Sequence, residues 1–454
     1  MKESATEQNK MGVMPITRLL LSISLPMMFA MLIQSLYNIV DSIFVAKISE
    51  NALTAVSLAF PIQSIMIAMA TGTGVGINAL VSMRLGQQEQ DKVNKSALNG
   101  LFLACCSFVL FFVVGALCMP AYMHQQTSDP EIAESGIIYL RIVTTMSFGL
   151  FGVITFDRLL QSTGRTVLTM ISQCAGAVFN CVFDPILIFG IGPFPRLGIA
   201  GAAYATVSGQ ILSCILSWQF NIRYNKEIQF SLKGFRPSLS IIRQIYKVGV
   251  PSILLGSINS VTSYTMNMIL GTFSSTAIAV YGIYFKLISF IFLPVFGLNN
   301  GIVPIVAYNF GACNKARIYK TIRTGIKFAF CIMACGTILF ELIPARLLQL
   351  FNASDHMLAI GVPALRIIAP SFLGAAVSIS LSSVFQALRH AFYSMIISFV
   401  RQLIVLLPCA YLLSRTGSIH NIWWCFLIAE VSALGMTFFF MGRIRRTVLN
   451  TLEG

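Results

Sequence analysis

The chain has 454 residues, of which 56% are hydrophobic and 10% are charged, whereas a soluble domain carries about 25% charged residues. This composition excludes a soluble globular domain. It predicts an all-α polytopic membrane protein, because the apolar runs are continuous and lack the alternation of a membrane β-barrel. The net charge of +15 does not indicate a nucleic-acid partner, since the basic residues lie in short loops between apolar runs. The eleven cysteines form no C-x-x-C pair or Cys/His cluster, so they predict no metal or redox site.

Apolar runs bounded by charged or turn residues predict twelve membrane-spanning helices. In chain order they cover residues 17–46, 52–83, 96–118, 135–157, 166–190, 200–222, 242–270, 277–308, 320–341, 360–386, 391–414 and 421–442. The first span follows a polar N-terminal stretch without a cleavage site, so we expect no cleaved signal peptide.

Basic residues in the predicted loops are distributed unequally between the two sides of the membrane. One side holds 23 Lys and Arg residues, and the other holds only Lys47, Arg196, Arg346 and Arg415. The positive-inside rule therefore predicts that both termini are cytoplasmic, in a bacterial-type inner membrane.

An internal duplication is visible at a constant offset of 225 positions. It relates Arg18 to Arg243, Pro26 to Pro251, Ser49 to Ser274, Gly76 to Gly301, Gly86 to Gly311, Gly100 to Gly325, Arg141 to Arg366, Gly149 to Gly374 and Gln161 to Gln386. The predicted domains are an N-terminal lobe at 1–222, a cytoplasmic linker loop at 223–241 and a C-terminal lobe at 242–454. Each lobe has an even number of spans, so both begin on the same side. This predicts a pseudo-two-fold axis along the membrane normal.

A polar stripe interrupts the first span. Gln34, Tyr37, Asn38 and Asp41 fall at helical spacing and share one face of a helix. Inserting an aspartate at the centre of a membrane helix costs about 2.5–3.5 kcal/mol. Asp41 therefore marks an ion, proton or substrate pathway, and the alternative is a carboxylate near enough to the surface to stay hydrated.

A second intramembrane acid, Asp184, lies in the fifth span. Asn180 is one turn earlier on the same face, and Pro185 frees a backbone carbonyl that can face an ion. A simple proline kink with a polar lining is the alternative. At 1.5 Å per residue, Asp41, Asp184 and Thr206 reach a similar depth in the outer third of the membrane. We therefore predict that Asp41, Asn180, Asp184 and Thr206 converge on a proton or hard-cation site, with a metal-ligand role only if sodium is the ion.

The acids are not duplicated, because Asp41 aligns with Met266 and Asp184 aligns with Cys409. Ion coupling is therefore expected in the first lobe. The candidates for the lining of a substrate cavity are Gln34, Tyr37, Asn38, Arg141 and Met266. Arg141 is also a candidate counter-ion, although its repeat partner has no acidic cluster, so a structural role is an equal alternative.

Glu430, Lys286 and Arg401 are further charged residues within predicted spans. Glu430 is a lone acid in the last span, where a second coupling site competes with a position near an aqueous vestibule. Lys286 and Arg401 are expected to snorkel toward the membrane surface.

These segments resemble the multidrug and toxic compound extrusion (MATE) family. The resemblance rests on SLP at 24–26, NIVDSIFVAKIS at 38–49, RLGQ at 84–87, QSTGRT at 161–166, NCVFDPILIFG at 180–190 and GIAGAAYAT at 198–206. It implies a twelve-helix, two-lobed fold that exports amphipathic, often cationic compounds, with Asp41 coupling the ion and Asn180, Asp184 and Thr206 completing the site. One branch of the family also places acids in spans seven, eight and ten. Those spans carry none here, so no second-lobe sodium site is expected.

The predicted function is antiport of small-molecule drugs or toxic compounds against protons or sodium by alternating access. The coupling ion is the only cofactor expected, the partners are the substrate and the lipid bilayer, and a monomer is expected to function. A flippase for a lipid-linked or other endogenous metabolite is the alternative on the same fold, although it needs a cavity rich in Arg and Lys. An intramembrane enzyme is not expected, because the spans contain no H-E-x-x-H motif and no evident Ser/His pair.

Overall fold

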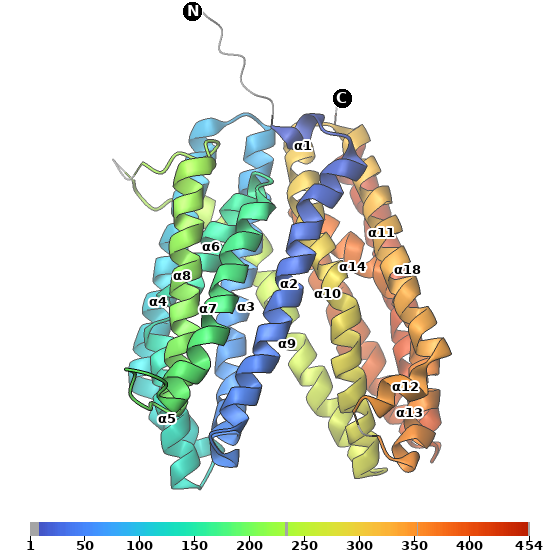
Figure 1. The fold of residues 1–454 in the computed structure, drawn as a ribbon. Helices are drawn as coiled ribbons and strands as arrows, with labels where there is room; N and C mark the ends of the chain where they lie inside the picture. Colours follow the sequence, from blue (N-terminus) through green and yellow to red (C-terminus); the bar gives the residue numbers. More distant parts are fainter. Residues whose placement is uncertain (1–8, 232–234, 352, 453–454) are drawn as a thin grey trace, which may run out of the picture. The chain divides into compact units, whose positions relative to one another are not determined.

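The computed structural model describes residues 9–231, 235–351 and 353–452, and its regular elements in these ranges are all helices (Figure 1). The helices are α1 (Lys10–Val13), α2 (Ile16–Ala46), α3 (Glu50–Gly86), α4 (Gln90–Gln126), α5 (Pro130–Thr145), α6 (Phe148–Ser162), α7 (Thr166–Phe189), α8 (Ile199–Tyr224), α9 (Leu239–Gly271), α10 (Ser275–Gly311), α11 (Lys315–Leu342), α12 (Pro344–Gln349), α13 (Asp355–Ile368), α14 (Ser371–Ala387), α15 (Ala391–Phe399), α16 (Leu407–Ser414), α17 (Ile419–Ile422) and α18 (Trp424–Ile444), with π-helical segments η1 (Val400–Leu406) and η2 (Arg445–Leu449).

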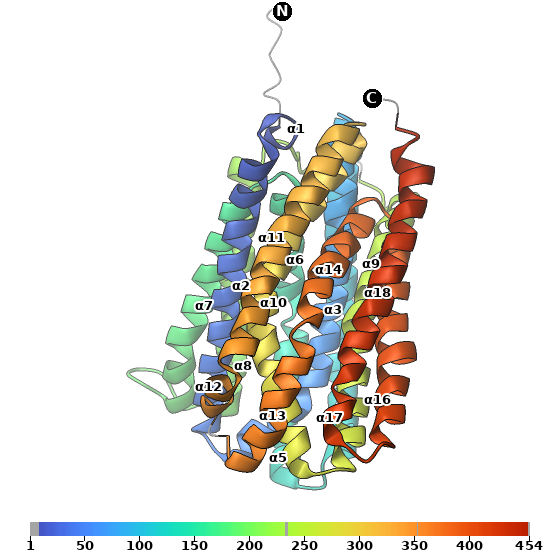
Figure 2. The same ribbon diagram turned by 90° about the vertical axis from the view of Figure 1, so that its right-hand side faces the viewer.

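Nine helices within the described ranges are long and apolar enough to cross a membrane. Two helix pairs each form a further, bent span. Helices α5 and α6 meet at 44°, and α13 and α14 meet at 49° (Figure 2). Helix α9 has 33 residues and is therefore about 50 Å long, which completes the twelve predicted spans. The fourth and tenth spans are thus bent where the sequence indicated continuous helices.

The chain divides into two compact units whose boundaries fall beside Pro26 and Pro251. The first-lobe unit is Leu25–Val250, and the second-lobe unit combines Met1–Ser24 with Pro251–Gly454. Each unit therefore contains the opening turns of the other repeat's first helix. Both prolines lie inside long helices, where each removes a backbone hydrogen bond and weakens the helix locally.

Matching local geometry confirms the duplication. Ser49 caps α3 and Ser274 caps α10, and each hydroxyl accepts a bond from the backbone N–H three residues later. Gln88 and Cys313, which are also 225 positions apart, both adopt a left-handed backbone, with φ of 58° and 55°. The two repeats therefore share caps and turns as well as helices.

One repeat-related pair of turns differs in strain. Gly164 has φ of 79°, and its partner in the second repeat is Arg389, with φ of 64°. A side chain in this conformation costs about 1 kcal/mol, and the Arg389 Nε is buried without a hydrogen-bond partner in the described part of the chain. We expect Arg389→Gly to raise the free energy of unfolding by about 1 kcal/mol, measured by unfolding of the purified protein in detergent. Gly164→Ala should lower it, and a loss of stability in Arg389→Gly would contradict this account.

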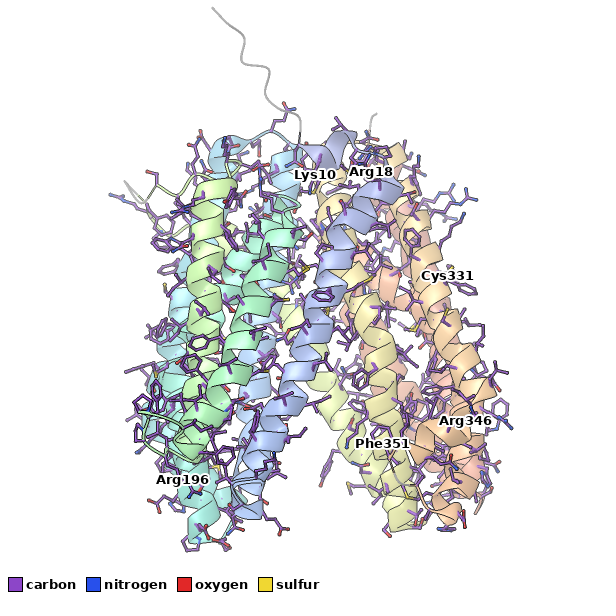
Figure 3. All side chains as sticks on the ribbon, in the orientation of Figure 1. Lys10, Arg18, Arg196, Cys331, Arg346 and Phe351 are labelled. Carbon is purple, nitrogen blue, oxygen red and sulfur yellow. The ribbon has the colours of Figure 1, made fainter. Side chains whose placement is uncertain are left out.

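Basic residues lie at both ends of the second-lobe unit. In the second-lobe unit, Lys10 and Arg18 lie at one end, and Arg346 and Phe351 lie at the other (Figure 3). The sequence likewise assigned Lys10 and Arg18 to one side of the membrane and Arg346 to the other.

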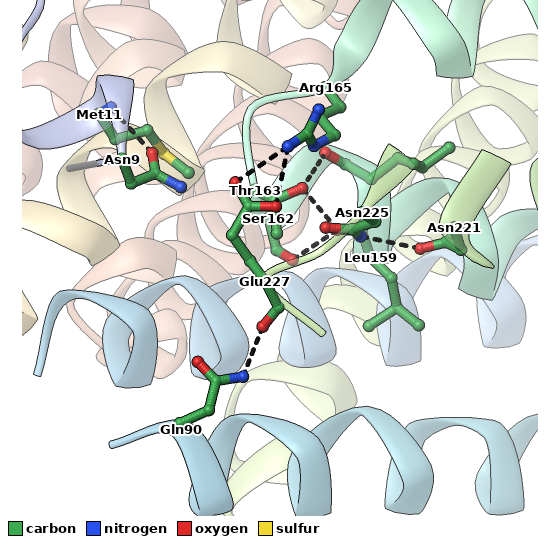
Figure 4. Close-up of polar contacts among 11 residues, drawn as sticks. Asn9, Met11, Gln90, Leu159, Ser162, Thr163, Arg165, Asn221, Asn225 and Glu227 are labelled. Atoms are coloured by element: carbon green, nitrogen blue, oxygen red, sulfur yellow. Dashed lines mark hydrogen bonds and ion pairs between the residues drawn. The ribbon is translucent and has the colours of Figure 1, made fainter. Parts of the chain in front are cut away.

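In the first-lobe unit, the loop after α8 is tied to its neighbours through Glu227 (Figure 4). The Glu227 carboxylate pairs with Arg165 at 3.0 Å, and its backbone carbonyl accepts a bond from Gln90 Nε2 at 2.7 Å. These contacts fix the beginning of the predicted linker loop against the helix ends around it.

Candidate functional site

The centre of the candidate site is a pair of carboxyl groups in the first-lobe unit. Asp41 on α2 and Asp184 on α7 lie within hydrogen-bonding distance of each other. Asp184 is fully buried, and the Oδ1 atom of Asp41 is buried without a hydrogen-bond partner among the described residues. Two carboxylates this close repel each other, so the arrangement favours a shared proton or a bound cation.

Asn180 connects this pair to α8. In either orientation of its amide, Asn180 bonds to Asp184 on one side and to Thr206 on the other. The better orientation donates to Asp184 Oδ2 at 3.0 Å and accepts from the Thr206 backbone N–H at 3.1 Å. Helices α7 and α8 run side by side here (Figure 1). Their backbones approach so closely that a Cβ on Gly209 would lie only 2.7 Å from the Gly176 carbonyl oxygen. Small residues thus allow the close approach that brings Thr206 to the site.

Proline contributes a free carbonyl near the acids. Helix α7 continues through Pro185 and ends at Gly190, which has φ of 73°. The missing N–H of Pro185 leaves the carbonyl of Cys181 without its helical donor, and Cys181 lies within electrostatic range of Asp41 and Asp184. A freed carbonyl near the acids is the feature that an ion-facing role of this segment requires.

The polar stripe of α2 is divided between the site and its surroundings. Tyr37 is hydrogen-bonded to Gln34 and lies within electrostatic range of Asp41 and Asp184. Asn38 is exposed, and its backbone carbonyl accepts a bond from Ser42. Gln34 and Asn38 are both exposed, and Tyr37 is the residue of the stripe that lies within electrostatic range of the acids.

Two residues of the site were missed from the sequence. Tyr139 on α5 is buried and lies near Asp41 and Tyr37, and its hydroxyl accepts a bond from Gln63 Nε2 on α3 at 3.0 Å. The available signal was a glutamine within the apolar run of the second span. Tyr139 was not singled out because its position near the acids depends on how α5 packs with other helices, which spacing along one helix does not show.

Two candidates for the lining of a substrate cavity, Arg141 and Met266, differ in burial and lie in different units. Arg141 is exposed and takes part in none of the ion pairs formed by the described residues, so the structure does not support it as a counter-ion. Met266 is fully buried within the second-lobe unit. Their place in the lining of a substrate cavity stays a prediction.

The first-lobe unit also holds a buried acid that the sequence did not single out. Asp157 on α6 accepts bonds from Ser172 at 3.2 Å, from Gln173 at 2.8 Å and from Ser217. These donors come from α7 and α8, so the Asp157 carboxylate joins three helices. Its sequence signal was an acid next to Arg158 at the end of the fourth predicted span.

The charges of the second-lobe unit correct two expectations. Glu430 is not a lone acid, because it pairs with Arg401 at 3.2 Å, and Arg401 therefore does not snorkel away from the spans. The ammonium group of Lys286 lies over the Phe351 ring, 5.9 Å from its centroid.

Eleven apolar spans among the described residues, together with the 33-residue helix α9, form two repeats with facing acids in the first. This arrangement is that of a multi-pass membrane transport protein. A family model described as MatE matches residues 26–186 and 251–412, which together make up most of the chain. The chain therefore belongs to the MatE family, which confirms the resemblance inferred from its motifs. The two matched segments begin at the repeat-related prolines, at the offset of the duplication.

Curated relatives and solved structures agree with this assignment. The chain is 27% identical over 437 residues to the multidrug export protein MepA of Staphylococcus haemolyticus (strain JCSC1435), covering 95% of this chain and 94% of the relative. It is 24% identical to MepA of Staphylococcus aureus (strain MRSA252), covering 97% of both. An outward-facing multidrug resistance MATE family transporter of the MOP superfamily superimposes with a TM-score of 0.91 at 24% identity, covering 99% of this chain and 100% of that structure. The fold is accordingly the twelve-helix, two-lobed fold of MATE transporters.

Proposed function

We propose that this protein is a secondary active exporter of amphipathic, often cationic small molecules, driven by entry of protons or sodium. The observation that supports the proposal most directly is the facing pair Asp41 and Asp184, with a buried carboxyl oxygen that has no partner within the described residues. The MepA relatives are described as multidrug export proteins, which supports small-molecule drugs as the cargo. Both termini are proposed to be cytoplasmic, from the distribution of basic loop residues.

Ion binding would act through α2. A proton or sodium ion between the two carboxylates removes their repulsion and draws α2 toward α7. Because α2 passes from one compact unit to the other beside Pro26, a shift of its outer half bends the helix at that proline. The residues around the acids thereby couple ion occupancy to the rearrangement that alternating access requires.

The proposal is tested with the purified full-length protein in proteoliposomes loaded with a fluorescent cationic dye. An imposed gradient of sodium or of pH should drive dye movement against its own gradient, and protein-free liposomes serve as the control. The gradient that drives movement identifies the coupling ion. If neither gradient moves the dye or a panel of neutral drugs, multidrug antiport is wrong, and a lipid-linked cargo becomes the function to test.

A further inference from the structure

The second-lobe unit contains an ion pair that the proposed mechanism does not use. One oxygen of Glu430 on α18 pairs with Arg401 on η1 at 3.2 Å, and the other accepts a bond from Ser378 on α14 at 2.8 Å. The Glu430 side chain is 8% exposed and the Arg401 side chain is 24% exposed. The carboxylate is thus held deep in the unit, while the guanidinium reaches it from a more accessible position.

The shared scaffold does not need this pair. At the offset of the duplication, Arg401 corresponds to Gly176 and Glu430 corresponds to Ala205, so the first repeat forms the same helices without either charge. Buried ion pairs are often no more stabilising than apolar residues of similar size, and charges within membrane spans are usually functional. The pair is therefore better explained by a ligand than by stability.

The duplication also relates this pair to the first-lobe site. Ala205 directly precedes Thr206, and Gly176 lies one turn before Asn180 on α7. Glu430 therefore occupies, within its own unit, a position adjacent to the one that the ion site holds in the other unit. The second repeat lacks the acids of the first but has a different acid beside the equivalent position.

The backbone that carries Arg401 is irregular. Residues Val400–Leu406 form a π-helical segment between α15 and α16, and such segments occur frequently at functional sites. Gln402 in this segment accepts a bond from Thr262 on α9 at 2.9 Å. Arg401 thus lies on a wide turn that a neighbouring helix holds in place.

Aromatic rings lie near the carboxylate, since Tyr284 on α10 is within electrostatic range of Glu430. Phe426 is one turn before Glu430 on α18, and its ring packs edge-to-face on Tyr284 with centroids 5.4 Å apart. Tyr281 lies 6.4 Å from the same ring. A carboxylate beside aromatic faces is the combination that binds organic cations, because ring faces and carboxylates both attract positive charge.

We propose that Glu430 is a binding site for a monovalent organic cation, and that the guanidinium of Arg401 occupies this site when no such ligand is bound. Binding exchanges one positive charge for another, so the buried carboxylate never remains unpaired, and Ser378 stays bonded to it throughout. That the bound cation is exported rests on the proposed function. Binding of the cation to Glu430 does not require transport.

The test is the equilibrium binding of ethidium to the purified full-length protein in detergent, followed by fluorescence polarisation. Arg401→Met removes the guanidinium that competes with the ligand, so it should lower the Kd for ethidium at least about tenfold. Glu430→Gln should raise this Kd by about tenfold or more. Asp355→Asn, which alters an exposed acid of the same unit, is the control for general electrostatic effects and should leave the Kd unchanged. Unchanged affinity in folded Arg401→Met and Glu430→Gln would overturn the proposal.

The double variant Arg401→Met with Glu430→Gln keeps the test decisive if Arg401→Met does not fold, because it buries no unpaired charge. Our proposal predicts that the double variant folds and binds ethidium about tenfold more weakly than the unmodified protein. A purely structural pair predicts unchanged binding, with altered thermal unfolding only. Because no gradient is present, a failed transport assay would leave this result unaffected, so failure of the site and failure of the proposed export are distinguishable.

Discussion

Asp184→Asn is expected to reduce gradient-driven dye movement in proteoliposomes to the level of protein-free liposomes. The variant keeps the size of the side chain and its bond to Asn180 but removes the charge that changes when an ion binds. The amide would donate permanently to Asp41, so the pair would stay in its attracted state whether or not an ion is present. Helix α2 would then lack the signal that couples ion entry to rearrangement.

Two measurements make this prediction specific. Thermal unfolding of Asp184→Asn should be no worse than that of the unmodified protein, because an amide costs less to bury in a membrane span than a carboxylate. Glu134→Gln changes an exposed acid of the same lobe and should transport normally. Coupled transport that survives in a folded Asp184→Asn protein would show that the facing carboxyl groups do not bind the driving ion.

The core of the site was predictable because it follows from position along straight helices. Asn180 and Asp184 are one turn apart on a single helix, and the depth of Asp41 and Thr206 follows from counting residues from the span ends. The structure brings these four residues together as that count predicts. Their roles stay predictions until transport is measured.

The residues that were missed all depend on contacts between helices. Tyr139 lies near the acids because α5 packs with other helices, and a periodic apolar pattern within one helix does not show that packing. Arg401 and Glu430 meet across two spans in the second repeat only, so neither helical spacing nor the duplication predicts their pairing. Spacing within one helix constrains which residues share a face, but it does not identify the partner helix.

The same limit applies to the domain boundaries. The duplication locates the repeats correctly in sequence, but the compact units exchange the opening turns of α2 and α9. That exchange depends on how closely each opening segment packs against the other repeat. In the second-lobe unit, for example, Ser24 on α2 donates a bond to the Leu298 carbonyl of α10 at 3.3 Å.

Gly76→Ala is expected to destabilise the protein by about 3 kcal/mol, near the upper end of the usual cost of overpacking. A Cβ on Gly76 would overlap the backbone carbonyl of Ile245 in the opening turns of α9, within the first-lobe unit. Backbone atoms cannot rotate away, so α3 and α9 would have to separate. The expected readout is a large fall in the thermal unfolding temperature and in the yield of folded protein from detergent.

Gly301→Ala is the matched control from the second repeat. There a Cβ would meet the Ser24 hydroxyl instead of backbone, and that side chain can rotate at the cost of its bond to Leu298, about 1 kcal/mol. The first substitution should therefore cost clearly more than the second, although the two glycines are equivalent in the duplication. Equal losses of stability in the two variants would contradict this account. They would mean that the opening turns of α9 move as readily as a serine side chain and are not a fixed part of the first-lobe unit.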